Sequence, residues 1–182
     1  MTETASASAA ADLNAFLDGQ KFGCVLADPF RANPAGKPLA QRFEEICALP
    51  VADHMEDRAH CYLWVPNARL PEGMKVLQSW GFKYTSNIVW QKSATDEAQL
   101  QIDDGEVFAD TTALLLFGIR GKNVRTLAPA RSTVNFIPPA AVGQTGESGK
   151  PDAQYHIIER CSWGPFLELF GHGARDGWTV WS

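Results

Sequence analysis

Short apolar runs alternate with segments of about ten residues that have helical spacing, and this alternation constrains the fold more than any other feature of the chain. The apolar runs are bounded by turn-forming residues, as buried strands are. The expected strands are 22–27, 60–65, 82–90, 112–118, 134–138, 165–170 and 178–181, and the expected helices are 39–47, 51–58, 70–80 and 151–161. Such alternation favours the α/β class, with a mostly parallel sheet and helices on both faces.

A single domain is expected to span residues 21–182, because no linker or internal repeat interrupts the pattern. Residues 1–20 are expected to be a disordered leader with a short helix from Asp12 to Leu17. The net charge of −5 excludes a wholly basic nucleic-acid binder, although a local basic patch is compatible with it. No run is long enough to span a membrane. No metal site is expected, and the four separated cysteines are predicted to be reduced thiols of a cytoplasmic protein.

Two acidic residues mark the ends of predicted strands. Asp28 follows the run Cys24–Ala27 and precedes Pro29, which cannot continue a strand ladder. Glu168 lies in a later strand that runs into a turn at Gly171. The carboxyl ends of strands line the ligand crevice of open α/β sheets, so both acids are candidate site residues. Taken alone, the Asp28-Pro29 dipeptide is a weak signal, and an ordinary tight turn is the preferred interpretation of the stretch around Gly171.

Basic residues gather in two loops that follow predicted strands. We expect them to contact the phosphates of a nucleic acid, and a solvated loop is the alternative. The residues in question are Arg31 and Lys37 after the first strand, and Arg120, Lys122, Asn123 and Arg125 after the run 112–118.

Several motifs, taken together and in order, resemble the MT-A70 family of adenine N6-methyltransferases, and within it the small DNA-modifying branch of bacteria and phages. The resemblance covers nearly all of the chain from Phe22 onward. The matching stretches are 26–29, 60–67, 80–84, 87–92, 116–123, 150–152, 157–160, 167–171 and 177–181.

The resemblance implies a Rossmann-like fold, S-adenosylmethionine as methyl donor, and a permuted motif order with the catalytic motif before the glycine turn. The exocyclic amine of adenine is a poor nucleophile because its lone pair is delocalised into the ring. Acceptors that hold its two hydrogens direct the lone pair toward the methyl group. By resemblance, Asp28 and Pro29 supply these acceptors and Phe30 stacks on the base, which must be flipped out of a duplex.

The resemblance also assigns the donor site. Glu168 would bind the ribose hydroxyls of S-adenosylmethionine, and Lys150 would bind its carboxylate end. Asp28, Phe170, Gly171 and His172 complete the predicted donor-binding set.

The chain departs from the family pattern at these same positions. The family motif Asp-Pro-Pro-Trp is replaced by residues 28–31, which read Asp-Pro-Phe-Arg, and Ala113 stands where the family usually has Glu. Gly149 and His172 each stand where the family usually has Arg. Two hypotheses therefore stay open. The chain is either an active adenine methyltransferase, with DNA or alternatively RNA as its substrate, or a catalytically silent member of the family. A silent member would bind nucleic acid or pair with an active paralogue. A homodimer and a different transferase chemistry in a reshaped pocket are further alternatives.

Overall fold

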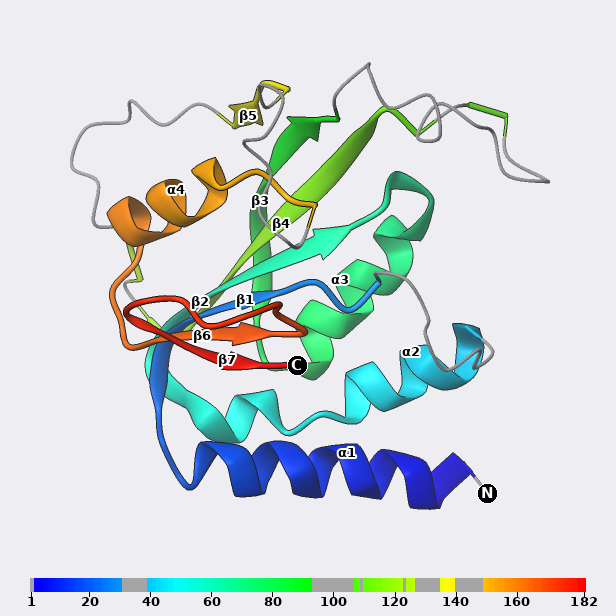
Figure 1. Ribbon diagram of the computed structural model, residues 1–182, viewed down its shortest axis with the longest axis vertical. Helices are drawn as coiled ribbons and strands as arrows, with labels where there is room; N and C mark the ends of the chain where they lie inside the picture. The colour runs from blue at the N-terminus through cyan, green and yellow to red at the C-terminus, as the bar shows by residue number, and fades with distance from the viewer. Residues whose placement is uncertain are drawn as a thin grey trace.

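The computed structural model describes residues 2–30, 39–92, 107–108, 110–122, 124–126, 135–139 and 149–182. Within these residues, seven strands form one sheet in the order β5-β3-β4-β2-β1-β6-β7 (Figure 1). The strands are β1 (Phe22–Ala27), β2 (Met55–Val65), β3 (Lys83–Gln91), β4 (Thr112–Arg120), β5 (Phe136–Ile137), β6 (Phe166–Leu169) and β7 (Trp178–Trp181).

The sheet is parallel except at β4. β1 lies inside the sheet and pairs in parallel with β2 on one side and β6 on the other. β7 and β5 also pair in parallel with their neighbours, whereas β4 runs antiparallel between β2 and β3. The α/β class and the mostly parallel sheet that the sequence predicted are therefore confirmed.

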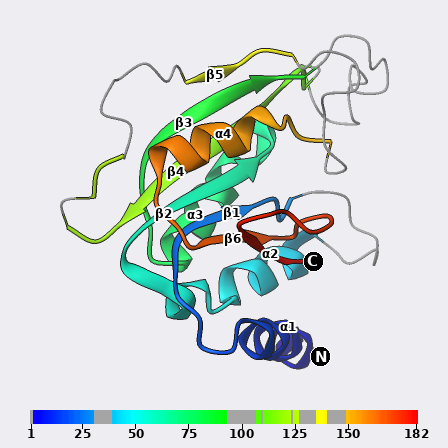
Figure 2. The same ribbon diagram turned by 60° about the vertical axis from the view of Figure 1, so that its left-hand side comes forward.

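Helices cover both faces of the sheet, as predicted (Figures 1 and 2). On one face, α1 (Thr2–Leu17), α2 (Leu39–Ala48) and α3 (Leu70–Ser79) enclose one apolar core with the sheet. On the other face, α4 (Ala153–Cys161) covers a second core around Trp64 and Ile158. None of the helices in the described part of the chain is long and apolar enough to cross a membrane.

The amino-terminal helix is longer than the sequence suggested. α1 begins at Thr2, whereas we predicted a disordered leader and a helix only from Asp12. The segment is rich in alanine, which has the highest intrinsic helix propensity. Leu13 and Leu17 lie one turn apart and are fully buried in the core, which anchors the helix. The helix therefore begins ten residues earlier than the predicted start at Asp12.

Residues 51–58 also differ from the prediction of a helix. Only Val51–His54 form a short 3-10 helix, and β2 already begins at Met55. Residues 56–58 are polar and exposed, but Met55 is paired with Phe22 and Ala59 with Arg120. Pairing with neighbouring strands, which local composition does not reveal, determines the structure here.

Candidate functional site

The two acids predicted from strand ends lie on neighbouring strands. Asp28 directly follows β1, and Glu168 lies in β6 opposite Leu26 of β1. Residues that are paired in a parallel ladder point to the same face, and Leu26 belongs to the core beneath α4. Asp28 and Glu168 therefore both point to the α4 face, at the place where the chain order reverses around β1. This is the position at which open α/β sheets bind ligands.

Asp28 is held by Lys150. The ammonium Nζ of Lys150 lies 2.5 Å from Asp28 Oδ2, and their side chains are only 16% and 13% exposed. The same ammonium lies 5.3 Å from the centre of the Trp64 ring, within the range of a cation–π contact. The structure thus brings two predicted site residues together, but Lys150 binds the acid of the predicted catalytic motif.

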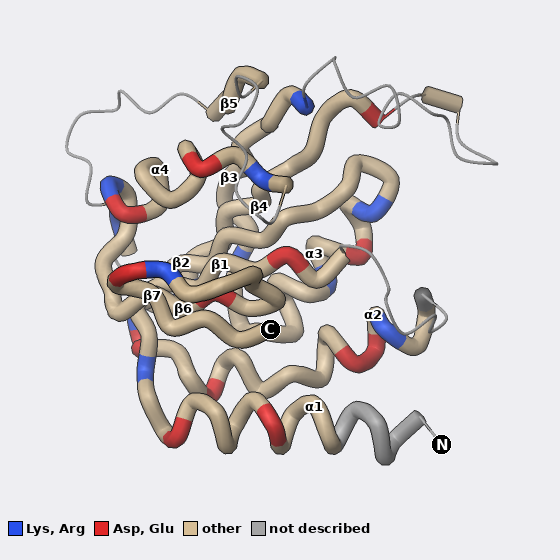
Figure 3. The backbone as a smooth tube through the Cα atoms, in the orientation of Figure 1, with Lys and Arg blue, Asp and Glu red and all other residues tan. Residues whose placement is uncertain are grey.

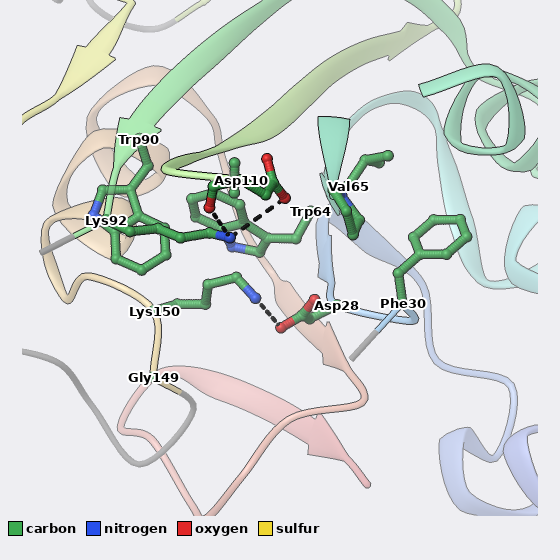
Figure 4. Close-up of a pocket in the computed structure, with 11 residues that line it drawn as sticks. Asp28, Phe30, Trp64, Val65, Trp90, Lys92, Asp110, Gly149 and Lys150 are labelled. Atoms are coloured by element: carbon green, nitrogen blue, oxygen red, sulfur yellow. Dashed lines mark hydrogen bonds and ion pairs between the residues drawn. The ribbon is translucent and has the colours of Figure 1, made fainter. Parts of the chain in front are cut away.

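A pocket of about 330 Å³ opens beside this ion pair (Figure 4). Trp64 and Trp90 meet edge to face in its wall, with their ring centres 5.8 Å apart. A second ion pair lies at the rim, where Lys92 Nζ is 3.4 Å from Asp110 Oδ2 and donates to the Asp110 carbonyl at 2.7 Å. Asn67 donates to the other oxygen of Asp110 at 2.5 Å. Each lysine in the pocket is therefore matched by an acid.

Sequence reasoning missed most of this pocket. Trp64 and Trp90 pack in the core beneath α4, and they also line the pocket. Lys92 and Asp110 were not singled out. Lys92 directly follows β3, and a charge just beyond the end of a strand is the signal that could have identified it. In the described residues, no group of three or more His, Cys, Asp or Glu side chains could hold a metal ion.

Pro29 and Phe30 face away from the Lys150 side of the pocket. Pro29 is buried, and its carbonyl accepts a hydrogen bond of 3.1 Å from the guanidinium of Arg42 in α2. Phe30 lines the pocket but packs against the core beneath α1–α3. Figure 4 shows Phe30 on the side of Asp28 opposite to Lys150. The predicted roles of these residues toward a base stay predictions.

Glu168 is held by Tyr155 of α4. The Tyr155 hydroxyl lies 3.0 Å and 3.1 Å from the two carboxylate oxygens of Glu168, and both residues are only 8% exposed. Burial raises the pKa of Glu168, and the hydrogen bond from Tyr155 opposes that rise. Burial and the neighbouring carboxylate raise the pKa of Tyr155 to about 12, so its hydroxyl remains a donor. The Arg175 guanidinium lies 3.3 Å from the centre of the Tyr155 ring and covers the pair.

The glycine turn after β6 contacts β7 rather than the pocket. Phe170 has a positive φ of 62° and meets Trp181 edge to face, with ring centres 5.5 Å apart. The Gly171 amide donates to the Trp181 carbonyl at 3.1 Å, and a β-carbon at Gly171 would lie 2.5 Å from Val180. His172 is exposed. None of these turn residues lines the described pocket.

The predicted nucleic-acid contacts lie elsewhere. Arg120 ends β4 and pairs with Ala59, at the end of the ladder opposite to Val65, and Lys122 and Arg125 follow it along the chain. Arg120 also donates to the Ala52 carbonyl at 2.6 Å, so part of its guanidinium has a structural role. Arg31, Lys37 and Asn123 lie outside the described residues.

The sheet order and the acids at its switch point are consistent with the Rossmann-like fold of S-adenosylmethionine-dependent methyltransferases. The MT-A70 family model matches residues 22–182, and the chain belongs to the MT-A70 family. Membership in this family implies S-adenosylmethionine as the methyl donor.

Three relatives illustrate the range of the family. The chain is 29% identical over 147 residues to the "N(6)-adenosine-methyltransferase non-catalytic subunit METTL14" of Xenopus tropicalis, which covers 76% of this chain and 32% of the relative. It is 27% identical over 171 residues to the human "N(6)-adenosine-methyltransferase catalytic subunit METTL3", covering 88% of this chain and 27% of the relative. A putative MT-A70-like N(6)-adenosine-methyltransferase of Medicago truncatula is 27% identical over 165 residues, covering 87% and 25%. The chain therefore spans between a quarter and a third of these relatives.

The side chains assigned to the donor already have partners within the chain. The carboxylate assigned to the ribose hydroxyls is buried and bound on both oxygens by Tyr155. The lysine assigned to the donor's carboxylate is bound to Asp28, and the amide of Gly171 is bound to β7. A donor would share these groups with the partners that they already have within the chain.

Proposed function

We propose that this chain is a non-catalytic member of an adenine N6-methylation complex, in which it binds nucleic acid and pairs with an active paralogue that carries S-adenosylmethionine. One observation carries the proposal. The three acceptors that the resemblance assigns to substrate and donor are all engaged by side chains of the chain itself. Lys150 holds Asp28, Arg42 holds the Pro29 carbonyl, and Tyr155 holds Glu168.

These contacts oppose the chemistry that an adenine methyltransferase requires. An amine becomes a better nucleophile only where preorganised acceptors hold its hydrogens in the transition state. At Asp28 the acceptor is neutralised by a largely buried lysine. Separating the partners of a buried ion pair is strongly unfavourable, at about 3–5 kcal/mol when one partner is removed. A base would have to overcome much of this cost before any transfer.

The relatives support a role in pairing. Their names include a catalytic and a non-catalytic subunit, so the family contains both kinds of chain. The departures from Asp-Pro-Pro-Trp support a role of the second kind for this chain. Size-exclusion chromatography with an active MT-A70 protein tests the pairing directly, and a homodimer is the alternative outcome.

The decisive experiment is calorimetry with S-adenosylmethionine. We expect no detectable binding by this chain alone, and no methyl transfer from a labelled donor to adenine in DNA or RNA oligonucleotides. Replacing Phe30 with Pro and Arg31 with Trp should not create activity, because the contacts to Asp28 and Glu168 remain. Mixing the chain with an active paralogue should raise that paralogue's activity. Donor binding together with methyl transfer by the isolated chain would overturn the proposal.

A second candidate is that the chain itself methylates adenine in DNA. The observation in its favour is the pocket beside Asp28, whose wall is built from two tryptophans suited to a flat base. In this case Asp28→Asn should abolish transfer while donor binding persists. DNA is preferred because the motifs resemble the compact bacterial and phage branch. Oligonucleotides of the same sequence in DNA and RNA distinguish the two substrates.

A further inference from the structure

Residues 172–177 lie between β6 and β7, and we call this segment the strap. Of these residues, all of which the structure describes, only Arg175 is not exposed. It is also the only Lys or Arg in the strap, and Figure 3 shows the charged positions along this part of the backbone. Gly173 and Gly177, near the two ends, have positive φ values of 77° and 78°. Arg175 is therefore the side chain that can hold the strap against the rest of the protein.

Arg175 holds the strap against the first turn of α4. Its guanidinium lies 3.3 Å from the centre of the Tyr155 ring, in a cation–π contact, and 3.4 Å from Asp152 Oδ1. The Asp152 side chain is 58% exposed, so water weakens this ion pair. Tyr155 is only 8% exposed, and the stacking on its ring is therefore the stronger contact. Arg175 acts as a latch that joins the strap to Tyr155.

The latch reaches Glu168 through Tyr155. The Tyr155 hydroxyl donates to the Glu168 carboxylate, whose two oxygens lie at 3.0 Å and 3.1 Å. Burial raises the pKa of Glu168, and the positive charge of Arg175 opposes that rise. The guanidinium is thus close enough to act on the carboxylate as well as on the ring. The strap, the ring and the buried acid form one connected unit.

Access limits what Glu168 can bind. A carboxylate that shares one hydroxyl hydrogen still has free lone pairs, so Tyr155 alone does not keep a ligand away. In nucleotide-binding sheets of this kind, an acid near a strand end binds ribose hydroxyls. Glu168 lies in β6 at such a place, but it is buried beneath Tyr155 and the latch. A nucleoside with free ribose hydroxyls is the class of ligand that this acid suits, provided that the strap moves.

We propose that Arg175 closes a ribose site in this chain, so that a nucleoside ligand reaches the Glu168 carboxylate only when Arg175 leaves the Tyr155 ring. The affinity for such a ligand is then reduced by the fraction of molecules in which the strap is open. This inference rests on the proposed function, in which the chain alone does not bind the donor, and it names the residue that is responsible.

Two measurements on Arg175→Ala test the proposal. The first is hydrogen exchange, by NMR, of the Trp178 amide, which donates to the Arg175 carbonyl at 3.1 Å. Loss of one partly desolvated cation–π contact corresponds to about a tenfold change in an equilibrium, so this amide should exchange about tenfold faster. The second is calorimetry with S-adenosylmethionine. Its apparent affinity should rise by the same factor of about ten, because the open fraction determines both quantities.

Two further variants serve as controls. Arg175→Lys keeps a positive charge over the ring and should restore most of the slow exchange of the Trp178 amide. Arg58→Ala is the matched control, because Arg58 also lies over an aromatic ring, 5.7 Å from the centre of Trp163, but is not part of the strap. It should leave both the exchange rate and the donor affinity unchanged.

Unchanged exchange in Arg175→Ala would overturn the latch. Faster exchange without a gain in donor affinity would overturn the closure of the ribose site. Donor binding by the wild-type chain at the affinity of Arg175→Ala would also overturn the closure, whereas the proposed function fails only if the wild-type chain transfers the methyl group as well. Hydrogen exchange is measured without any donor, so the two failures are distinguishable.

Discussion

Replacing Tyr155 with Phe removes a single hydroxyl from the contact that occupies Glu168. The hydroxyl donates one hydrogen, shared between two carboxylate oxygens, so one charge-assisted hydrogen bond is lost. Such bonds contribute about 1.5–3 kcal/mol. Both side chains are almost fully buried, so water cannot replace the donor. With a urea m-value of about 2 kcal/mol/M, we expect the unfolding midpoint at neutral pH to fall by about 1 M.

The pH dependence of the stability lost in Tyr155→Phe distinguishes the contribution of the hydrogen bond from that of packing. Burial raises the pKa of Glu168 in the folded state, so the wild-type chain gains stability as pH falls through that raised pKa toward the ordinary value of about 4.3. Losing Tyr155, whose hydrogen bond favours the carboxylate, raises the pKa further. The penalty of Tyr155→Phe should therefore be largest at neutral pH. Below the ordinary pKa it should shrink to that of a neutral hydrogen bond, about 0.5–1.5 kcal/mol.

Urea unfolding of four proteins measures the effect: wild type, Tyr155→Phe, Glu168→Gln and the double variant. In the Glu168→Gln background the tyrosine should contribute about 1 kcal/mol less, because its acceptor is uncharged. Tyr84→Phe is the matched control, since Tyr84 donates at 2.8 Å to the neutral, partly buried Asn87. A penalty that is independent of pH, or unchanged in the Glu168→Gln background, would refute the reasoning.

Three further substitutions test other parts of the fold. Burial lowers the pKa of His60 to about 4, so the free energy of unfolding should fall as pH decreases from about 6.5 toward 4. In His60→Gln the free energy of unfolding, measured with urea, should depend less on pH in this range. Gly171→Ala places a β-carbon 2.5 Å from Val180 and should cost about 1–3 kcal/mol, measured by thermal unfolding. Gln154→Leu leaves the buried Trp64 indole N–H without its 2.6 Å acceptor and should cost about 1–3 kcal/mol in urea unfolding; an unchanged midpoint would contradict the contact.

The strands were predictable because their signal is local. β1 is a run of six buried residues ended by an acid and a proline, and the structure keeps the predicted bounds. The start of β2 was not predictable, because residues 56–58 are polar and become a strand through its pairing with β1 and β4.

The site was only partly predictable from the sequence. The positions of Asp28 and Glu168 followed from strand ends, but their partners did not. Lys150 is 122 residues from Asp28 along the chain, and only the family resemblance drew attention to it. The contacts of Arg42 and Tyr155 depend on how α2 and α4 pack on the sheet, which no spacing in the sequence reveals.

The site lies beyond the end of the strand ladder, and this placement affects which substitutions such a chain tolerates during evolution. All six residues of β1 are buried in the core, whereas Asp28 and Phe30 follow it and are only partly buried. In this chain the strand is retained, whereas residues 30 and 31 depart from the family motif. Selection for folding alone therefore does not preserve a catalytic motif at this position. After gene duplication, one copy can lose the catalytic residues that follow the strand and still keep the sheet and its surface. Such a copy can be retained because it assembles with other proteins.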